Sequence, residues 1–180
     1  MQVRITFAQG DISQIAVEAL VIEANTELVM EGGVADAIRR KGGPRIQAEC
    51  ERLAPLRLGA AAATTGGNLR ANYVIHAAIA TPDGKATPES IRLATHQSLL
   101  RAQEKTIKTL AFPALGAGPA GVPIKECAQV MLKVVLEHVK MRTTLEKIFF
   151  VLDDDAAREV FEAAHRQLTS RRSSDLPPAV

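Results

Sequence analysis

Aromatic residues, cysteine and long apolar runs are scarce in this 180-residue chain, which has one tyrosine, no tryptophan and two cysteines. A helix that spans a bilayer needs about 18 or more consecutive apolar residues, and no run in the chain approaches that length. The opening stretch MQVRITFAQG also lacks the apolar segment of a signal peptide. We therefore expect a cytoplasmic protein with no membrane partner.

The two cysteines, Cys50 and Cys127, lie far apart and outside any CxxC motif or histidine-rich cluster. This spacing does not predict a disulfide framework or a zinc site. We expect two buried thiols and no metal site.

The chain also lacks a large excess of positive or negative charge, since the net charge is only +2 and the Lys and Arg residues are spread along the chain. Such a balance does not create the strong field that attracts proteins to nucleic acids. Nucleic acid is therefore not an expected partner. The chain has no GxxxxGK[ST] motif, which argues against an ATP-hydrolysing P-loop, and we do not expect an ordinary Rossmann dinucleotide site.

What the chain does contain is an alternation of short β-branched runs with longer helical patterns, at a length and hydrophobic content (47%) suited to one domain. We expect strands over 3–7, 18–22, 60–65, 73–79, 109–112 and 148–152, and helices over 33–40, 44–53, 88–105, from Pro123 to about 138, and 155–168. This alternation predicts an α/β domain with helices on both faces of a largely parallel sheet.

Three local signals refine this expectation. Gly66-Gly67-Asn68 predicts a hairpin between the third and fourth strands. In the first helix, Val34 and Ile38 have the spacing of an inward-facing stripe. The end of the chain, 169–180, is polar and proline-rich, so we expect a disordered tail there.

Two glycine-rich loops, 30–34 and 115–122, each follow a strand and precede a helix. In α/β folds, ligands sit beyond the carboxyl ends of the strands, where such loops lie. Glycines let successive backbone N–H groups surround an anion, and the start of the next helix adds partial positive charge. Two such loops suggest that the ligand contains a diphosphate. The alternative for either loop alone is that its glycines only close a tight turn.

The chain resembles the macro domain family, which binds ADP-ribose. The resemblance rests on five blocks in order: QGDIS at 9–13, LVIEANTELVMEGGVADAI at 20–38, YVIHAA at 73–78, FPALGAGPAG at 112–121, and the last strand and helix. It implies a three-layer α/β/α fold with a mixed, largely parallel central sheet over residues 1–168. It also implies a cleft that holds ADP-ribose between the two glycine loops, with neither a cofactor nor a metal.

The resemblance assigns roles to individual positions. Asp11 and the backbone of Ile12 match positions that read adenine, and Asn25 matches a position near the distal ribose. The matching loop and adenine-side positions are Gly32, Gly33, Val34, Leu115, Gly116, Ala117, Gly118, Pro119, Ala120, Gly121 and Leu152. Read without the resemblance, Asp11 fits a helix N-cap and Asn25 fits a turn former. His76 lies on a buried-looking strand, so we expect a core histidine there and not a base.

Several positions depart from the family pattern. Ile22 and Glu23 replace the first two residues of the family's NAAN block. Glu31 stands where the first loop normally has glycine, and its charge opposes a diphosphate unless the side chain turns outward. Pro119 has no N–H to donate to a phosphate. Ala120 stands where the family commonly has an aromatic residue.

The departures bear on whether the protein is an enzyme. In the hydrolytic branch of the family an aspartate stands at the position of Ala35, and the next residue, Asp36, is rotated by about 100° on a helix. Loss of a general base costs roughly 10² to 10⁴ in rate, whereas binding by backbone amides survives such a change. Binding of ADP-ribose or of ADP-ribosylated molecules is therefore our main prediction.

Two alternatives stay open. One is a hydrolase that removes ADP-ribose from modified side chains or deacetylates O-acetyl-ADP-ribose, with Asn25 positioning water as its catalytic residue. The other is a reader of nucleic acid or poly(ADP-ribose) that uses the arginines near the C-terminus, which is the weakest of the three because a few such arginines commonly serve solubility.

Overall fold

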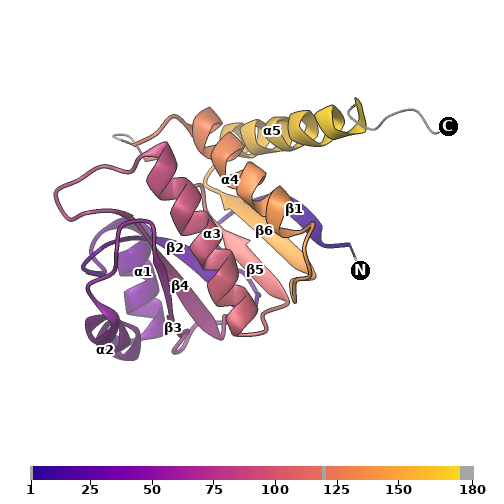
Figure 1. The fold of residues 1–180 in the computed structure, drawn as a ribbon. Coiled ribbons are helices and arrows are strands. Elements are labelled where there is room, and N and C mark those ends of the chain that lie inside the picture. The colour runs from indigo at the N-terminus through magenta and orange to yellow at the C-terminus, as the bar shows by residue number, and fades with distance from the viewer. Residues whose placement is uncertain (1, 119–120, 175–180) are drawn as a thin grey trace.

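The computed structural model describes residues 2–118 and 121–174 (Figure 1). Its strands are β1 (Arg4–Gln9), β2 (Ala19–Asn25), β3 (Ala61–Thr65), β4 (Tyr73–Ala80), β5 (Thr109–Phe112) and β6 (Lys147–Leu152). Its helices are α1 (Gly33–Gly42), α2 (Pro44–Leu53), α3 (Pro88–Glu104), α4 (Ile124–His138) and α5 (Asp155–Ser174), with a short 3₁₀ helix η1 (Ile12–Gln14). Every strand and helix expected from the sequence is present, and η1 is added to them.

The six strands form one sheet in the order β1-β6-β5-β2-β4-β3. All neighbouring pairs are parallel except β3 and β4, which pair antiparallel with Thr65 opposite Tyr73. The predicted hairpin is confirmed by this pair. The sheet is therefore mixed and largely parallel, as expected.

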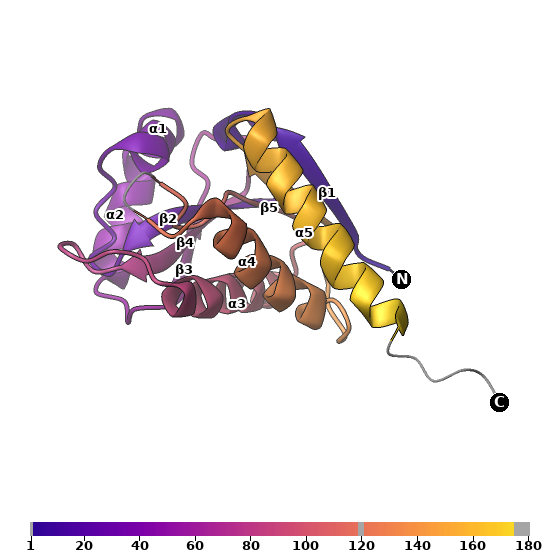
Figure 2. The same ribbon diagram turned by 90° about the horizontal axis from the view of Figure 1, so that it is seen from above.

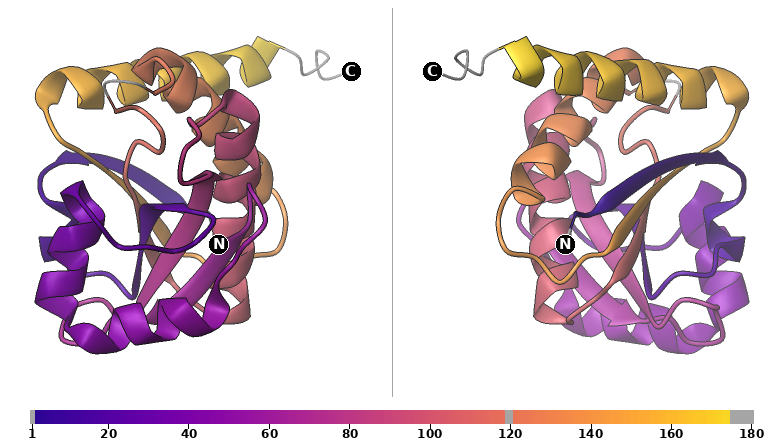
Figure 3. Two further views of the ribbon diagram at one scale, coloured as in Figure 1. Left: turned by 90° about the vertical axis from the view of Figure 1, so that its left-hand side faces the viewer. Right: turned by 90° about the vertical axis from the view of Figure 1, so that its right-hand side faces the viewer.

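Side chains of the central strands alternate between two hydrophobic layers. On β2, Val21 packs with residues of α3, α4 and α5, while Leu20 and Ile22 pack with residues of α1 and α2 on the opposite face. Successive residues of any extended strand point to opposite faces of the sheet. A strand that is covered on both faces therefore has apolar residues at successive positions. Figures 2 and 3 show the sheet between the two groups of helices, so the three-layer α/β/α fold is confirmed.

The layer under α4 and α5 is built around phenylalanine. Phe150 of β6 stacks on Phe112 of β5, with ring centroids 5.8 Å apart, and meets Phe161 of α5 at 5.2 Å. All three side chains are completely buried. Burial of each such ring stabilises the fold by about 1.5–3 kcal/mol, which fixes β6 and the loop that follows it relative to β5.

His76 is a core residue of the opposite layer, as expected. Its ring is completely buried, and Nε2 lies 2.9 Å from Thr64 Oγ1 and 3.6 Å from Cys50 Sγ. Burial lowers the pKa of His76 to about 4, because the charged form cannot be solvated there. Cys50 and Cys127 are buried free thiols, and burial raises the pKa of Cys50 to about 12 and that of Cys127 to about 11.

Two details differ from the sequence expectation. The last helix continues to Ser174 and does not end near Leu168; Thr169 lies within it, and its hydroxyl donates to the carbonyl oxygen of His165 one turn earlier. The rest of the expected tail, 175–180, lies outside the described residues. Val34 is not a core residue: it is 42% exposed in the first turn of α1, whereas Ile38 one turn later is fully buried.

The arrangement of the strands determines where a ligand can bind. Because β2, β4, β5 and β6 are parallel, their carboxyl ends meet at one edge of the sheet, and the loops that follow them gather there. Within the described residues, no helix is long and apolar enough to cross a membrane.

Candidate functional site

Two adjacent cavities lie at the carboxyl edge of the sheet. The first, of 380 Å³, contains Asn25 and is here called the Asn25 pocket; the second, of 470 Å³, contains Leu152 and is called the Leu152 pocket. The residues that line both cavities are Glu23, Glu31, Ala35 and Gly118. Because they share these walls, the two pockets are halves of one cleft.

The first glycine loop supplies one wall of the cleft. Gly32, Gly33 and Val34 line the Leu152 pocket, and Gly32 has a left-handed φ of 71°. No side chain in the described part of the chain caps the start of α1. The first N–H groups of a helix have no acceptor within the helix. This wall therefore has backbone donors of a kind that can bind an anion.

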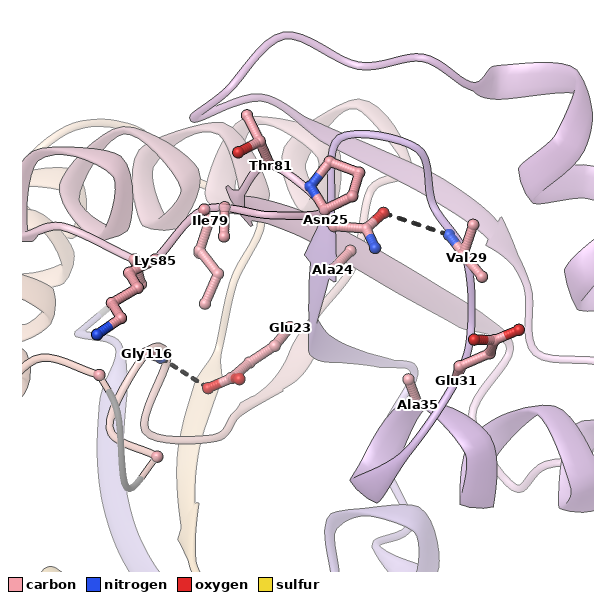
Figure 4. Close-up of a pocket in the computed structure, with 16 residues that line it drawn as sticks. Glu23, Ala24, Asn25, Val29, Glu31, Ala35, Ile79, Thr81, Lys85 and Gly116 are labelled. Atoms are coloured by element: carbon pink, nitrogen blue, oxygen red, sulfur yellow. Dashed lines mark hydrogen bonds between the residues drawn. The ribbon is translucent and has the colours of Figure 1, made fainter.

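Glu31 belongs to the same loop and lines both pockets. Its carboxylate points away from Glu23 in Figure 4. The side chain is exposed, so water screens its charge. The outward orientation reduces the repulsion that the sequence led us to expect.

The second glycine loop, between β5 and α4, forms the opposite wall. Its cleft-lining residues are Gly116, Ala117, Gly118 and Gly121. Several of its N–H groups are used inside the loop: that of Ala117 donates to the carbonyl oxygen of Ala114, and that of Gly121 to that of Gly118. Among residues 2–118 and 121–174, the N–H of Gly118 has no acceptor. Pro119 and Ala120 lie outside the described residues.

The expectation that the chain has no ordinary Rossmann site needs a ground other than glycine spacing. Gly116, Gly118 and Gly121 have the GxGxxG spacing of loops that bind a pyrophosphate, so glycine spacing does not exclude a Rossmann site. The strand order does exclude it. A Rossmann sheet has its glycine loop after the first strand of an order 3-2-1-4-5-6, whereas here the loop follows β5 and the sheet ends in an antiparallel strand.

Glu23 occupies the floor of the cleft, which the sequence did not predict. Its Oε1 accepts a hydrogen bond of 2.6 Å from the backbone N–H of Gly116 (Figure 4). Desolvation raises the pKa of Glu23 above its usual value, while the Gly116 N–H lowers it and the nearby charge of Asp153 raises it further. The signal in the sequence was the two-residue spacing from Asn25, since alternate strand residues share a face.

Asn25 ends β2 and points its amide into the Asn25 pocket. Its Oδ1 accepts hydrogen bonds from the N–H groups of Glu27 at 3.0 Å and Val29 at 3.4 Å. Its Nδ2 has no partner among the described residues. Asn25 is therefore both a turn former and a donor directed at the cavity, so the two roles considered for it are compatible.

The positions that the resemblance assigned to adenine lie near the Leu152 pocket. The N–H of Gly10 donates to the carbonyl oxygen of Leu152 at 3.0 Å, which places Asp11 and Ile12 beside that pocket although neither belongs to its described lining. Leu152 lines the pocket but is 1% exposed. Leu115 is completely buried in the core and lies outside the described lining of both cavities.

Asp11 is the N-cap of η1 and is heavily hydrogen-bonded. Its Oδ1 accepts from the hydroxyl of Ser13 at 2.6 Å and from the Ser13 N–H at 2.9 Å, and its Oδ2 pairs with Lys41 Nζ at 3.0 Å. These bonds, led by that of the Ser13 hydroxyl, lower the pKa of Asp11 to about 2. The carboxylate remains ionised at neutral pH and keeps lone pairs for a further donor.

The charges around the cleft are mostly negative. Its described lining includes four carboxylates and one ammonium group: Glu23, Glu31, Asp153, Asp154 and Lys85. Lys85 and its neighbour Thr81 lie in the loop after β4, which sequence analysis did not include in the site. Only the sheet order, which puts the end of β4 beside the end of β2, brings this loop to the cleft.

No group of three or more His, Cys, Asp or Glu side chains in the described ranges 2–118 and 121–174 is placed to hold a metal ion. The site instead offers backbone amides from two loops, an amide side chain and one ammonium group. This combination suits an anion that also carries hydroxyl groups.

Comparisons with known proteins agree with this geometry. The macro domain family model matches residues 21–131. An uncharacterized protein of Mycobacterium tuberculosis is 39% identical over 156 residues, covering 87% of this chain and 43% of that protein. ADP-ribose glycohydrolase MACROD2 of Xenopus laevis is 37% identical, covering 82% of this chain and 36% of that protein.

The chain thus spans about two fifths of the length of these curated relatives. A solved structure with the same fold is the Trypanosoma brucei macrodomain in complex with ADP-ribose, at a TM-score of 0.81 and 24% identity, covering 89% of this chain and 68% of that one. The chain belongs to the macro domain family.

Proposed function

We propose that the protein binds ADP-ribose, free or attached to other molecules, in the cleft between the two glycine loops. The observation that carries this proposal is that both loops open onto one continuous cleft at the carboxyl edge of the sheet. Converging backbone N–H groups can hold a diphosphate without a basic residue. The macrodomain of Trypanosoma brucei, which shares the fold, holds ADP-ribose.

The adenosine end fits the Leu152 pocket. Asp11 stands at the edge of this pocket as an ionised acceptor, which suits the exocyclic amine of adenine. Leu152 and Val34 offer apolar contact to the ring, although neither can stack on it as an aromatic side chain does. We therefore expect adenine to be read by hydrogen bonds more than by stacking.

The distal ribose fits the Asn25 pocket. Nδ2 of Asn25 is a donor without a partner among the described residues, and Thr81 and Lys85 line the same pocket. Ribose hydroxyls accept as well as donate, so they can satisfy these groups. The molecule to which the ribose is attached would then extend from this end of the cleft.

Isothermal calorimetry with ADP-ribose, on the wild type and on Gly118→Glu, tests the proposal. A Cβ at Gly118 would meet nothing within 4 Å, so the substitution fits the fold but puts bulk and negative charge between the two pockets. We expect micromolar binding by the wild type, as is ordinary for a small ligand, and loss of more than about 30-fold in the variant. Absence of binding by a correctly folded wild type would refute the proposal.

A second candidate function is hydrolysis of an ADP-ribosyl bond. The observation that favours it is the 37% identity to MACROD2 of Xenopus laevis, an ADP-ribose glycohydrolase. In this chain Ala35 stands at the usual aspartate position, so water would have to be positioned by Asn25 and by the diphosphate of the substrate.

Release of ADP-ribose from a peptide modified on a carboxylate, and of acetate from O-acetyl-ADP-ribose, tests this second function. Wild type, Asn25→Ala and an active relative are compared under the same conditions. Product formed by the wild type and reduced at least about tenfold in Asn25→Ala supports hydrolysis. No product from the wild type, while the relative is active, leaves binding as the function.

A further inference from the structure

Glu23 lies where the two halves of the cleft meet. It is the third-last residue of β2, and it lines both the Asn25 and the Leu152 pockets. Its side chain reaches the second glycine loop, whereas the amide of Asn25 points toward Val29 (Figure 4). A group at this junction must meet any ligand that extends from one pocket into the other.

The partner of Glu23 is a fixed donor. Gly116 has a left-handed φ of 75°, and a Cβ there would stand 2.6 Å from Ile91 Cδ1, so the turn is packed against α3. Its carbonyl oxygen accepts from the N–H of Val122, which closes the loop. The amide of Gly116 is therefore held in place, and the carboxylate of Glu23 comes to it.

A carboxylate oxygen on this amide makes the same contact that a phosphate oxygen of a ligand would make. Both are anionic acceptors that bind backbone N–H groups in charge-assisted hydrogen bonds. Of the other described amides of the loop, those of Ala117, Gly121 and Val122 donate to carbonyl oxygens within it, which leaves those of Leu115 and Gly118 without an acceptor among the described residues. Glu23 thus holds one of the few donors that the loop has.

We propose, on the basis of the function proposed above, that Glu23 is a specificity-determining residue that acts as an internal competitor for the anionic part of the ligand. While its carboxylate holds the Gly116 N–H, a phosphate can take that amide only after Glu23 is displaced or protonated. The protein then binds a diphosphate more weakly than the backbone of its two loops allows. The loss is the same for small free anions, but these lack the hydroxyl and adenine contacts that offset it, so they no longer fill the cleft at concentrations at which the whole ligand does.

The charges that face Glu23 give the direction of the pH dependence. Asp153 after β6 opposes ionisation of Glu23, as does burial, so its pKa is raised. The Cys127 thiol of α4 is neutral, since the pKa of that thiol is about 11. The other charged groups of the junction are Glu31 before α1, Asp154 after β6 and Lys85 after β4. Protonation of Glu23 removes a negative charge from beside the ligand, so affinity for a diphosphate rises as the pH falls through this pKa.

The test compares wild type with Glu23→Gln and Glu23→Ala, using ADP-ribose and inorganic pyrophosphate as probes in calorimetry. At neutral pH we expect Glu23→Gln to bind both probes about tenfold more tightly than wild type, because a like-charge contact in the cleft opposes binding strongly. Glu31→Gln is the matched control. It removes the same charge from the same cleft without touching Gly116, and we expect about a twofold change because its carboxylate is exposed and screened.

A second measurement follows the Gly116 amide directly. In the free wild-type protein its ¹⁵N–¹H resonance should shift as Glu23 titrates, and this shift should be missing in Glu23→Gln. Over the same range, wild-type affinity for ADP-ribose should rise with falling pH, and the rise should be much smaller in Glu23→Gln. A diphosphate diester stays ionised over this range, so the ligand does not contribute to the change.

The outcomes separate this inference from the function on which it depends. If Glu23→Gln binds pyrophosphate more tightly but no variant binds ADP-ribose, Glu23 is a competitor and the proposed ligand is wrong. If ADP-ribose binds wild type and Glu23→Gln equally at every pH, the proposed ligand is supported but the competitor role of Glu23 is refuted. The same holds if ADP-ribose binds the variants more weakly than wild type. The competitor role is equally refuted if neither probe binds any of the proteins, or if the Gly116 resonance does not titrate.

Discussion

A Cβ atom at Gly121 would stand 2.0 Å from the carbonyl oxygen of Gly116. The two glycines are held together because the N–H of Val122 donates to that same oxygen at 2.9 Å. Gly118, between them, has open space where a Cβ would be. Glycine therefore occupies these two positions of one loop for different reasons. The fold requires glycine at position 121, whereas at Gly118 the position opens toward the cleft.

This difference predicts unequal effects of the same substitution. Gly121→Ala should lower the free energy of unfolding by about 1–3 kcal/mol, since backbone must move to admit the methyl group. Gly118→Ala should change it by less than about 0.5 kcal/mol. Chemical denaturation of both variants beside wild type checks this. Equal stabilities of the two variants would contradict the assignment of Gly121 to the fold.

Substitutions of Asn25 separate its two roles. Asn25→Asp keeps an acceptor for the N–H groups of Glu27 and Val29 but loses the Nδ2 donor and adds charge near Glu23. We expect near wild-type thermal stability and about tenfold or more weaker ADP-ribose binding, since a lost hydrogen bond and a new repulsion act together. Asn25→Ala should lose stability as well. Unchanged affinity in Asn25→Asp would show that the amide does not meet the ligand.

Lys85 supplies the one positive side chain in the described lining of the cleft. Lys85→Gln should weaken ADP-ribose binding several-fold, and the salt dependence of the dissociation constant should become shallower because a charge pair is lost. Lys105, which lies over the ring of Tyr73 outside the described lining of the cleft, provides the control. Lys105→Gln should leave both quantities unchanged. An equal effect of the two substitutions would mean that only net charge matters.

Asp11 should determine the preference for adenine. ADP should bind about fivefold more tightly than inosine diphosphate, whose base lacks the exocyclic amine, because one hydrogen bond is worth about 1 kcal/mol. In Asp11→Asn the preference should vanish or reverse, since Oδ1 still accepts from Ser13 while the group that replaces Oδ2 is a donor and no longer pairs with Lys41. Competition calorimetry with both nucleotides measures the ratio. The same ratio in wild type and variant would place the adenine elsewhere.

His76 should make stability depend on pH. Its pKa is about 4 in the folded protein against 6.5 for a free histidine, so the unfolded chain binds the extra proton first as the pH falls. The free energy of unfolding should therefore rise by roughly 3 kcal/mol on this account between pH 4 and pH 6.5. Urea denaturation across this range measures the slope. His76→Gln should have a smaller slope, and an identical slope would assign the effect to other groups.

Local patterns in the sequence predicted the elements well. The helix α2 begins at Pro44, where the first turn tolerates proline, and ends at Leu53 as expected. The strands β2 and β4 were readable because both of their faces are buried, which demands continuous apolar residues. The end of α5 was not readable, because the expected boundary depended on a change to polar composition and the helix continues through polar residues to Ser174.

The parts of the candidate site that could be predicted are those formed by backbone groups of one short segment. Gly32, Gly33, Gly116 and Gly118 mark such segments, since an anion loop leaves its signature in consecutive residues. Lys85 was missed because its loop has no signature and reaches the cleft only through the position of β4 beside β2.

By itself the sequence determined the order of strands and helices, the two glycine loops and the alternation that covers both faces of the sheet. These depend on hydrophobic period and backbone freedom, which act over a few neighbouring residues. Only the tertiary structure decided that Glu23 meets Gly116, since these residues are 93 positions apart and the hydrogen bond exists only when β2 and β5 lie side by side. Contacts of this kind set the charge and the free donors of the cleft, and therefore what it can bind.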